Sequence, residues 1–300
     1  MRKMGIAALA IVLTAGLLAG CGKKTDHATM EHGSMASESA EASHAASNGD
    51  GHVGHDEMEG MGEEEAKPST TAEWQWEDGD SGALEFNEEN PLMIRITDEN
   101  GKPVEKFKLN HEKLMHLIVV RSDLMHYQHI HPEYEGDGRF VVSVDFPTGG
   151  TYKLFADYIP ENGSATTHSV AADVTGKGGV APTPLVPDIE TSKTEGGTTV
   201  SLQLDGAKAG KETKLTYHLT DEKTGKPVTD LEPVLGAIGH VVILDEGAER
   251  YLHVHPVVED AKGPDAEFMT TFPVAGLYKI WGQFKRDGKE FTVPFVVRIT

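Results

Sequence analysis

The chain has 300 residues, of which 48 are acidic and 27 basic, and its formal net charge at pH 7 is −21. This excess of carboxylates repels nucleic acid and anionic lipid, so we expect cations rather than nucleic acid as partners. Cys21 is the single cysteine, which excludes a disulfide framework. It also argues against blue-copper electron transfer, which needs a thiolate ligand.

The N-terminal residues have the pattern of an export signal. Two basic residues precede an apolar run over residues 5–18, which is too short for a dependable membrane span. The run leads into the motif Leu-Ala-Gly-Cys21, which resembles the lipobox of bacterial lipoproteins. The resemblance implies that residues 1–20 are a removed signal peptide and that Cys21 carries lipid, which anchors the chain to the membrane outside the cytoplasm. An ordinary transmembrane anchor is the alternative.

Residues 21–72 are rich in Ser, Ala, Gly, Glu and His and nearly lack branched or aromatic apolar residues. Such a segment cannot bury enough surface to offset the entropy of ordering, so we expect a disordered tether. Its Met/His stretch over residues 26–35 resembles the repeats of bacterial copper- and silver-resistance proteins, which implies metal capture by imidazole and soft thioether ligands. A low-complexity linker is the alternative. The candidate tether ligands are His27, Met30, His32, Met35, His52, His55, Met58 and Met61.

From residue 73 onward, short alternating or apolar runs lie between clusters of Gly, Pro, Asn and Asp, and no stretch has a helical stripe. This pattern predicts an all-β protein with two tandem Ig-like, Greek-key type antiparallel β-sandwiches, at residues 73–179 and 189–300. We expect strands at residues 92–96, 115–121, 127–131, 140–146, 152–158 and 167–174 in the first, and at residues 200–204, 214–219, 239–244, 250–255, 267–272, 278–284 and 291–299 in the second.

The pattern His-x-His-Pro occurs twice, and each copy has another histidine thirteen residues before its first His. The first triad is His116, His129 and His131, and the second triad, 124 residues later, is His240, His253 and His255. Self-similarity at a fixed period indicates a duplicated structural unit. Because the repeated unit carries imidazoles, the repeat points to chemistry as well as to architecture.

The spacing within each triad predicts a hairpin that gathers three imidazoles. If the strands of the first triad pair around a loop at residues 122–125, His116 faces His131 and His129 lies beside them on the same face. The second triad has the same spacing, so His240 is expected opposite His255. Three neutral imidazoles with an open fourth position suit Zn(II) or Cu(II), and we therefore expect one metal site in each sandwich.

The fourth ligand of the first site is left open between water, Met125, His126 and a donor from the tether. His168 is a weaker candidate, for which we favour a solvent-facing strand position. We expect His111 and His218 at the surface, because polar strand positions commonly face water.

Each triad also has a purely structural interpretation, in which the histidines are satisfied by backbone carbonyls. The histidine face of the first hairpin holds Ile118, Val120 and Tyr127 as well, so the triad could lie in a wall of the core. Three converging histidines, repeated in a second unit, favour a transition-metal site.

The repeat includes Gly101-Lys-Pro-Val and its copy at Gly225, together with the histidines and a Phe-Pro…Gly-x-Tyr-Lys pattern. These positions resemble secreted bacterial metal-handling sandwiches with YtkA-like or FixH-like Ig-type domains. The resemblance implies a lipoprotein that binds copper, as Cu(II) or Cu(I), or else zinc or silver, for buffering, resistance or delivery to a metal-receiving protein. An Ig-like adhesion or scaffold lipoprotein is the alternative. A metal-dependent hydrolase is less favoured, and we name no catalytic residue, because no general-base motif accompanies the triads.

Overall fold

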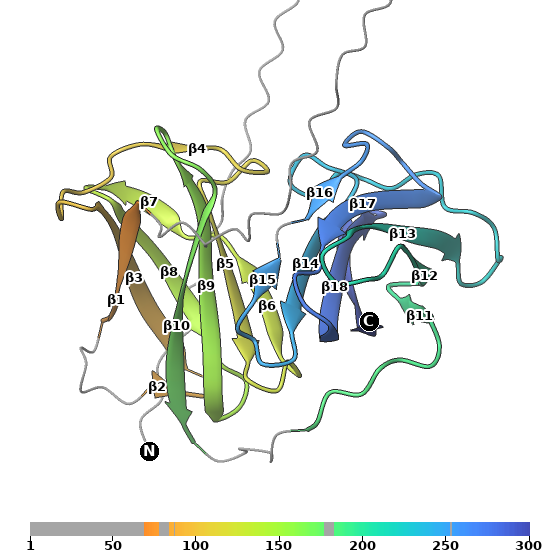
Figure 1. Ribbon diagram of the computed structural model, residues 1–300, viewed down its shortest axis with the longest axis horizontal. Coiled ribbons are helices and arrows are strands. Elements are labelled where there is room, and N and C mark those ends of the chain that lie inside the picture. Colours follow the sequence, from red (N-terminus) through yellow and green to blue (C-terminus); the bar gives the residue numbers. More distant parts are fainter. Residues whose placement is uncertain (1–68, 78–83, 87, 177–182, 253) are drawn as a thin grey trace, which may run out of the picture. The chain divides into compact units, whose positions relative to one another are not determined.

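The computed structural model describes residues 69–77, 84–86, 88–176, 183–252 and 254–300 (Figure 1). These ranges form two β-sandwiches, called sandwich 1 and sandwich 2 below, which belong to one compact unit over residues 63–300. The described part contains no helix that is long and apolar enough to cross a membrane. Cys21 and the predicted tether ligands lie outside the described residues.

Sandwich 1 consists of two sheets, one with the strand order β1-β3-β8-β7 and one with the order β2-β10-β9-β5-β6, in which β4 also pairs with β9. The described ladders are antiparallel apart from β2, which runs parallel to β10. The strands are β1 (Thr70–Trp76), β2 (Leu84–Glu85), β3 (Glu89–Asp98), β4 (Phe107–Lys108), β5 (Met115–Arg121), β6 (Tyr127–Ile130), β7 (Glu133–Gly136), β8 (Arg139–Asp145), β9 (Gly150–Pro160) and β10 (Thr166–Thr175).

Sandwich 2 repeats this arrangement, with sheets ordered β11-β12-β13-β17-β16 and β15-β14-β18-β19. Its strands are β11 (Ser192–Glu195), β12 (Thr198–Asp205), β13 (Glu212–Asp221), β14 (His240–Asp245), β15 (Tyr251–Leu252), β16 (His255–Pro256), β17 (Asp265–Thr271), β18 (Gly276–Arg286) and β19 (Lys289–Ile299). The order β10-β9-β5-β6 of sandwich 1 corresponds to β19-β18-β14-β15. The expected fold class, two tandem Ig-like sandwiches, is confirmed.

The first expected hairpin has the register that the spacing predicts, since Leu117 pairs with Ile130 and Ile118 with His129. The second hairpin begins in the predicted register, with Ile243 opposite Leu252, but ends there. The backbone of His255 pairs with Met269 on β17, so it does not continue the ladder opposite His240. The chain crosses from one sheet to the other at this point, as sandwich 1 does between β6 and β7, and the expected strand at residues 250–255 is therefore split.

Both faces of β5 and β14 are buried, because every residue of these strands is buried. One set of alternating side chains, such as Leu117 and Ile243, enters the core of its own sandwich. The other set enters a third apolar cluster that both sandwiches share, and Ile118 and Val242 belong to it. The histidine face of β5 therefore forms part of the interface between the sandwiches.

Candidate metal centre

Aromatic stacks repeat across the interface between the sandwiches. Tyr127 of sandwich 1 stacks on Trp281 of sandwich 2, with ring centroids 4.7 Å apart and planes 13° apart. Phe155 of sandwich 1 meets Tyr251 of sandwich 2 at 6.0 Å and 27°. Tyr251 is the repeat counterpart of Tyr127, and Trp281 that of Phe155. Each stack therefore joins the same two repeat positions, one from each sandwich. The two sandwiches are thus related by an approximate twofold axis.

His116 and its repeat counterpart His240 stack on each other, with ring centroids 5.3 Å apart and planes 14° apart. A contact between two equivalent residues must lie near the approximate twofold axis. The ring of His240 is also 4.8 Å from that of His129 and 5.1 Å from that of His111. The structure therefore brings a histidine of the second triad against the first triad.

The first triad converges as the spacing predicts. The ring centroid of His116 is 5.0 Å from that of His129 and 5.1 Å from that of His131. One ligand nitrogen from each of the three rings lies within 4.8 Å of the other two. Among the described residues this is the group of three that could hold a metal ion. His253 lies outside those residues, and the side chain of His255 is not described, so the second triad remains a prediction.

The outer nitrogens of two of the rings lie within hydrogen-bond distance of protein oxygens. The Nε2 of His116 is 2.8 Å from the backbone oxygen of Asn110, and the Nδ1 of His129 is 2.7 Å from Oε1 of Gln283. Both oxygens accept, so both of these ring nitrogens donate a proton. A neutral imidazole carries one N–H, so with this amide orientation Nδ1 of His116 and Nε2 of His129 are the nitrogens that would bind a metal ion.

These two nitrogens are 2.8 Å apart and share a hydrogen bond, whose donor depends on the tautomers of the two rings. Two nitrogens bound to one zinc or copper ion at about 2.0–2.1 Å are about 2.9 Å apart at a right angle and about 3.3 Å apart in a tetrahedron. An opening of a few tenths of an ångström would thus let both rings share an ion. Metal-bound histidines usually donate their other N–H to a carbonyl or carboxylate, which is the arrangement around His116 and His129.

His131 joins the cluster to a groove at the surface. Its Nε2 is buried and has no hydrogen-bond partner among the described residues. The residue lines a groove of about 730 Å³ together with Glu77, Glu133, Glu135 and apolar residues of β3 and β8. The carboxylates give this groove a negative potential, which attracts a cation toward the third imidazole.

Burial keeps these imidazoles neutral at pH 7. Desolvation lowers the pKa of His129 to about 4, although its hydrogen bond to Gln283 opposes the shift. Desolvation also lowers the pKa of His131 to about 4, with a further contribution from His116. The same effect holds the pKa of His240 well below its usual value. Neutral imidazole is the form that binds a metal ion.

The remaining histidines of the described residues differ in how well their positions match the sequence expectations. His126 lies beside Tyr152, 5.8 Å between ring centroids, and is not part of the converging group. His168 is half-buried and its ring stacks near Tyr158 of the core, so it is only partly exposed to solvent. His111 is not an isolated surface residue, since it joins the cluster from a loop in which its φ is 46°. His218 is at the surface as expected, 2.5 Å from Asp265.

Met125, the other candidate for a fourth ligand, is 57% exposed. The neighbour that sequence reasoning missed is Gln283, because its contact with His129 joins positions 154 residues apart in different sandwiches. The place of His111 in the cluster was also missed, although its position five residues before His116 offered a weak signal. Contacts of this kind arise from tertiary packing.

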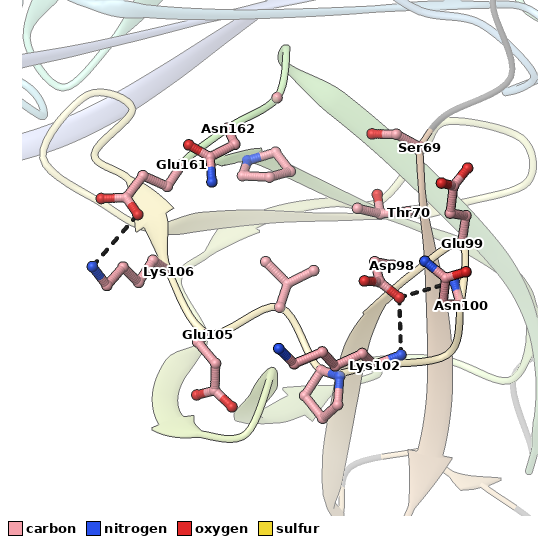
Figure 2. A pocket seen from close by; sticks show the side chains of 14 residues that line it. Ser69, Thr70, Asp98, Glu99, Asn100, Lys102, Glu105, Lys106, Glu161 and Asn162 are labelled. Atoms are coloured by element: carbon pink, nitrogen blue, oxygen red, sulfur yellow. Dashed lines mark hydrogen bonds and ion pairs between the residues drawn. The ribbon is translucent and has the colours of Figure 1, made fainter.

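A second hollow, of about 470 Å³, lies at one end of sandwich 1 (Figure 2). Its lining comes from the start of β1, the segment between β3 and β4, and the turn between β9 and β10. Lys106 and Glu161 form an ion pair at 3.6 Å, and Asp98 accepts hydrogen bonds from the backbone of Asn100 and Lys102. The lining contains no imidazole or thioether, so this hollow is chemically distinct from the histidine cluster.

The family described as "Domain of unknown function (DUF8832)" matches residues 70–176 and, a second time, residues 192–300. No curated protein matches the sequence. The adhesin InvE of Yersinia pseudotuberculosis is similar in structure, with 11% identity and a TM-score of 0.24 over 76% of this chain and 58% of that one.

Invasin, a bacterial integrin-binding protein, has 12% identity and a TM-score of 0.21 over 76% of this chain and 39% of its own. The D00-D0 domain of intimin has 8% identity and a TM-score of 0.22, over 76% and 99%. The chain thus spans 58% and 39% of the lengths of InvE and invasin. At these TM-scores the likenesses carry no argument about activity, ligand or partner.

Proposed function

The chain belongs to the DUF8832 family of domains of unknown function, and we propose that it is a metal-binding lipoprotein held outside the cytoplasm by lipid on Cys21. In this proposal the first triad binds a transition-metal ion and the Met/His tether collects ions from solution. The protein would act in metal buffering, resistance or delivery to a receiving protein.

One observation carries the proposal: one ligand nitrogen from each of His116, His129 and His131 lies within 4.8 Å of the other two, and Nδ1 of His116 is 2.8 Å from Nε2 of His129. A metal ion that displaces the proton shared by this pair would bind both nitrogens, once they open to the separation of about 2.9–3.3 Å that bonds of about 2.0–2.1 Å require. His131 supplies a third imidazole next to an acidic groove.

We favour copper over zinc on ligand chemistry. Three imidazoles suit Cu(II) and Zn(II) equally well, so the triad alone does not decide between them. The methionines predicted as tether ligands suit Cu(I), and zinc has little use for a thioether. A protein that carries both ligand sets fits copper, with silver as a second ion that the tether would take.

A structural role is the second candidate function, in which the chain is an Ig-like adhesion or scaffold lipoprotein. It is favoured by a specific feature of the same hydrogen bonds. If the amide of Gln283 turned its NH₂ toward His129, then Nε2 of His129 could donate to His116, and His116 to Asn110. That chain of hydrogen bonds would be complete without an ion.

Metal titration separates the two functions. The chain lacking residues 24–66 is titrated with Cu(II) and with Zn(II), in the parent form and with His131→Ala. We expect about two tight equivalents in the parent, one for each triad, and one fewer in the variant. His218→Ala is the matched control, because His218 is a surface histidine remote in sequence from both triads, and it should lose none. An unchanged stoichiometry in His131→Ala would remove the first triad as a metal site.

A further inference from the structure

The most informative contact of the first triad comes from the other sandwich. Gln283 lies on β18 and is half-buried at the interface. Its Oε1 accepts a hydrogen bond from Nδ1 of His129 at 2.7 Å and another from the hydroxyl of Tyr127 at 3.3 Å. The same Tyr127 stacks on Trp281, two residues before Gln283. The interface thus fixes the position of the amide that meets Nδ1 of His129.

We propose that Gln283 is a positioning residue for the metal site of sandwich 1, so that metal binding and docking of the two sandwiches stabilise each other. This inference rests on the proposed function, because it concerns the same site. While the amide oxygen holds the proton on Nδ1, Nε2 of His129 offers its lone pair toward His116. Undocking of sandwich 2 removes this acceptor, and His129 is then free to place its proton on Nε2, which blocks the ligand position.

The coupling is reciprocal by thermodynamic necessity. An interaction that raises metal affinity in the docked state must stabilise the docked state by the same free energy when the ion binds. The ion is bound by residues of sandwich 1, yet its binding should restrict motion in β14 and β18 of sandwich 2. The site would therefore serve as a metal-dependent clamp between two domains.

Two substitutions at Gln283 distinguish positioning from packing. Gln283→Met keeps the length of the side chain but cannot accept the hydrogen bond. Gln283→Glu keeps an acceptor, and a carboxylate can only accept, so it holds the proton on Nδ1 of His129 more firmly. Loss of a hydrogen bond of this kind typically weakens metal affinity about 10–100-fold.

The experiment uses the mature full-length chain and measures its affinity for Zn(II) and Cu(II) by competition. The site of interest is the tight equivalent that is absent from His131→Ala. We expect about 10-fold or greater weakening in Gln283→Met and an affinity equal to or tighter than wild type in Gln283→Glu. Gln203→Met, at an exposed position on β12, is the matched control and should bind as wild type does. A purely packing role would weaken both Gln283 variants alike.

Hydrogen exchange supplies a second readout that does not depend on affinity. Zn(II) should slow amide exchange in β14 and β18 of the wild-type chain, and this protection should be lost in Gln283→Met. If Zn(II) binds the triad but Gln283→Met binds within twofold of wild type, the coupling is overturned while the proposed function stands. If His131→Ala binds as many tight equivalents as the wild-type chain, the first triad is not a metal site and the proposed function itself is overturned.

Discussion

Asp157 occupies in sandwich 1 the place that Gln283 occupies in sandwich 2. His116 pairs with Asp157 across the β5–β9 ladder, and its repeat counterpart His240 pairs with Gln283 across the β14–β18 ladder. Asp157 is 2% exposed and accepts a hydrogen bond from the hydroxyl of Thr167. The duplicated site therefore has an amide on one side of the approximate axis and a carboxyl group on the other.

Burial makes Asp157 a source of pH-dependent stability. Desolvation raises its pKa from 3.8 to about 6, against the opposing hydrogen bond from Thr167. Between these two values the folded chain keeps a proton that the unfolded chain has released, so the free energy of unfolding falls as pH rises from about 4 through 6. A difference of this size is worth on the order of 3 kcal/mol at pH 7.

We expect Asp157→Asn to be more stable than wild type at pH 7.5, by up to about 3 kcal/mol, and to differ little at pH 4. Asparagine keeps an oxygen for the Thr167 hydroxyl but has no charge to desolvate. Urea unfolding of the metal-free proteins at several pH values measures the difference. Asp173→Asn, at an exposed position on β10, should leave the pH profile as it is. Equal pH profiles for wild type and Asp157→Asn would contradict the assignment.

Among the elements, β5 and β14 show what sequence could and could not predict. Both strands and their registers follow from short apolar runs and from the repeat, and β5 was expected at residues 115–121, as observed. Their continuous apolar character, without a polar alternate face, is typical of strands buried on both sides. The structural interpretation of the triad put Ile118 and Val120 in a wall of the core, whereas they pack between the sandwiches. Periodicity detects burial but does not identify the partner.

The strands that the sequence failed to predict lacked a local pattern of sufficient length. β2, β4 and β16 have two residues each, and β7 and β11 have four. Periodicity needs several alternations before it differs from chance. β1 was missed for another reason, since the sandwich was expected to begin at residue 73 and this strand begins at Thr70. The site residues on long strands were accordingly easier to place than the loop residue His111.

Trp281 on β18 tests how strongly the interface couples the two sandwiches. The residue is 3% exposed and stacks on Tyr127 of β6. Replacement of a buried tryptophan by alanine usually costs about 3–5 kcal/mol, and here the lost contacts lie mainly between domains. We expect Trp281→Ala to convert one calorimetric unfolding transition into two, while Trp281→Phe keeps an aromatic stack and one transition. A single transition shifted by less than about 1 kcal/mol in Trp281→Ala would mean that the sandwiches are joined elsewhere.

At the scale of the whole molecule, the candidate site depends on the way two copies of one domain face each other. The sequence predicted that each copy would gather its own three histidines, and the first triad does converge. It could not predict that His240 would stack on His116, because no local pattern specifies which faces of two domains pack together. The duplication nevertheless limits the outcome, since equivalent residues meet whenever two copies pack about an approximate twofold axis.

We expect the tether and the sandwiches to divide metal handling between them, because their predicted ligand sets differ. If the tether is disordered, as its composition predicts, it must lose conformational freedom to wrap an ion, so it should bind more weakly and exchange faster than imidazoles held on paired strands. Deletion of residues 24–66 should leave the tight Cu(II) equivalents intact and abolish the additional Cu(I) or Ag(I) equivalents measured by titration under reducing conditions.

The matched control for this deletion is a full-length variant in which the four tether methionines are changed to leucine, since it keeps the length and charge of the segment. These methionines are Met30, Met35, Met58 and Met61. Because thioether is the ligand that prefers Cu(I), this variant should lose most of the additional Cu(I) capacity and keep the tight Cu(II) equivalents. If the deletion empties the tight sites instead, the tether donates ligands to them. The triads would then be incomplete sites on their own.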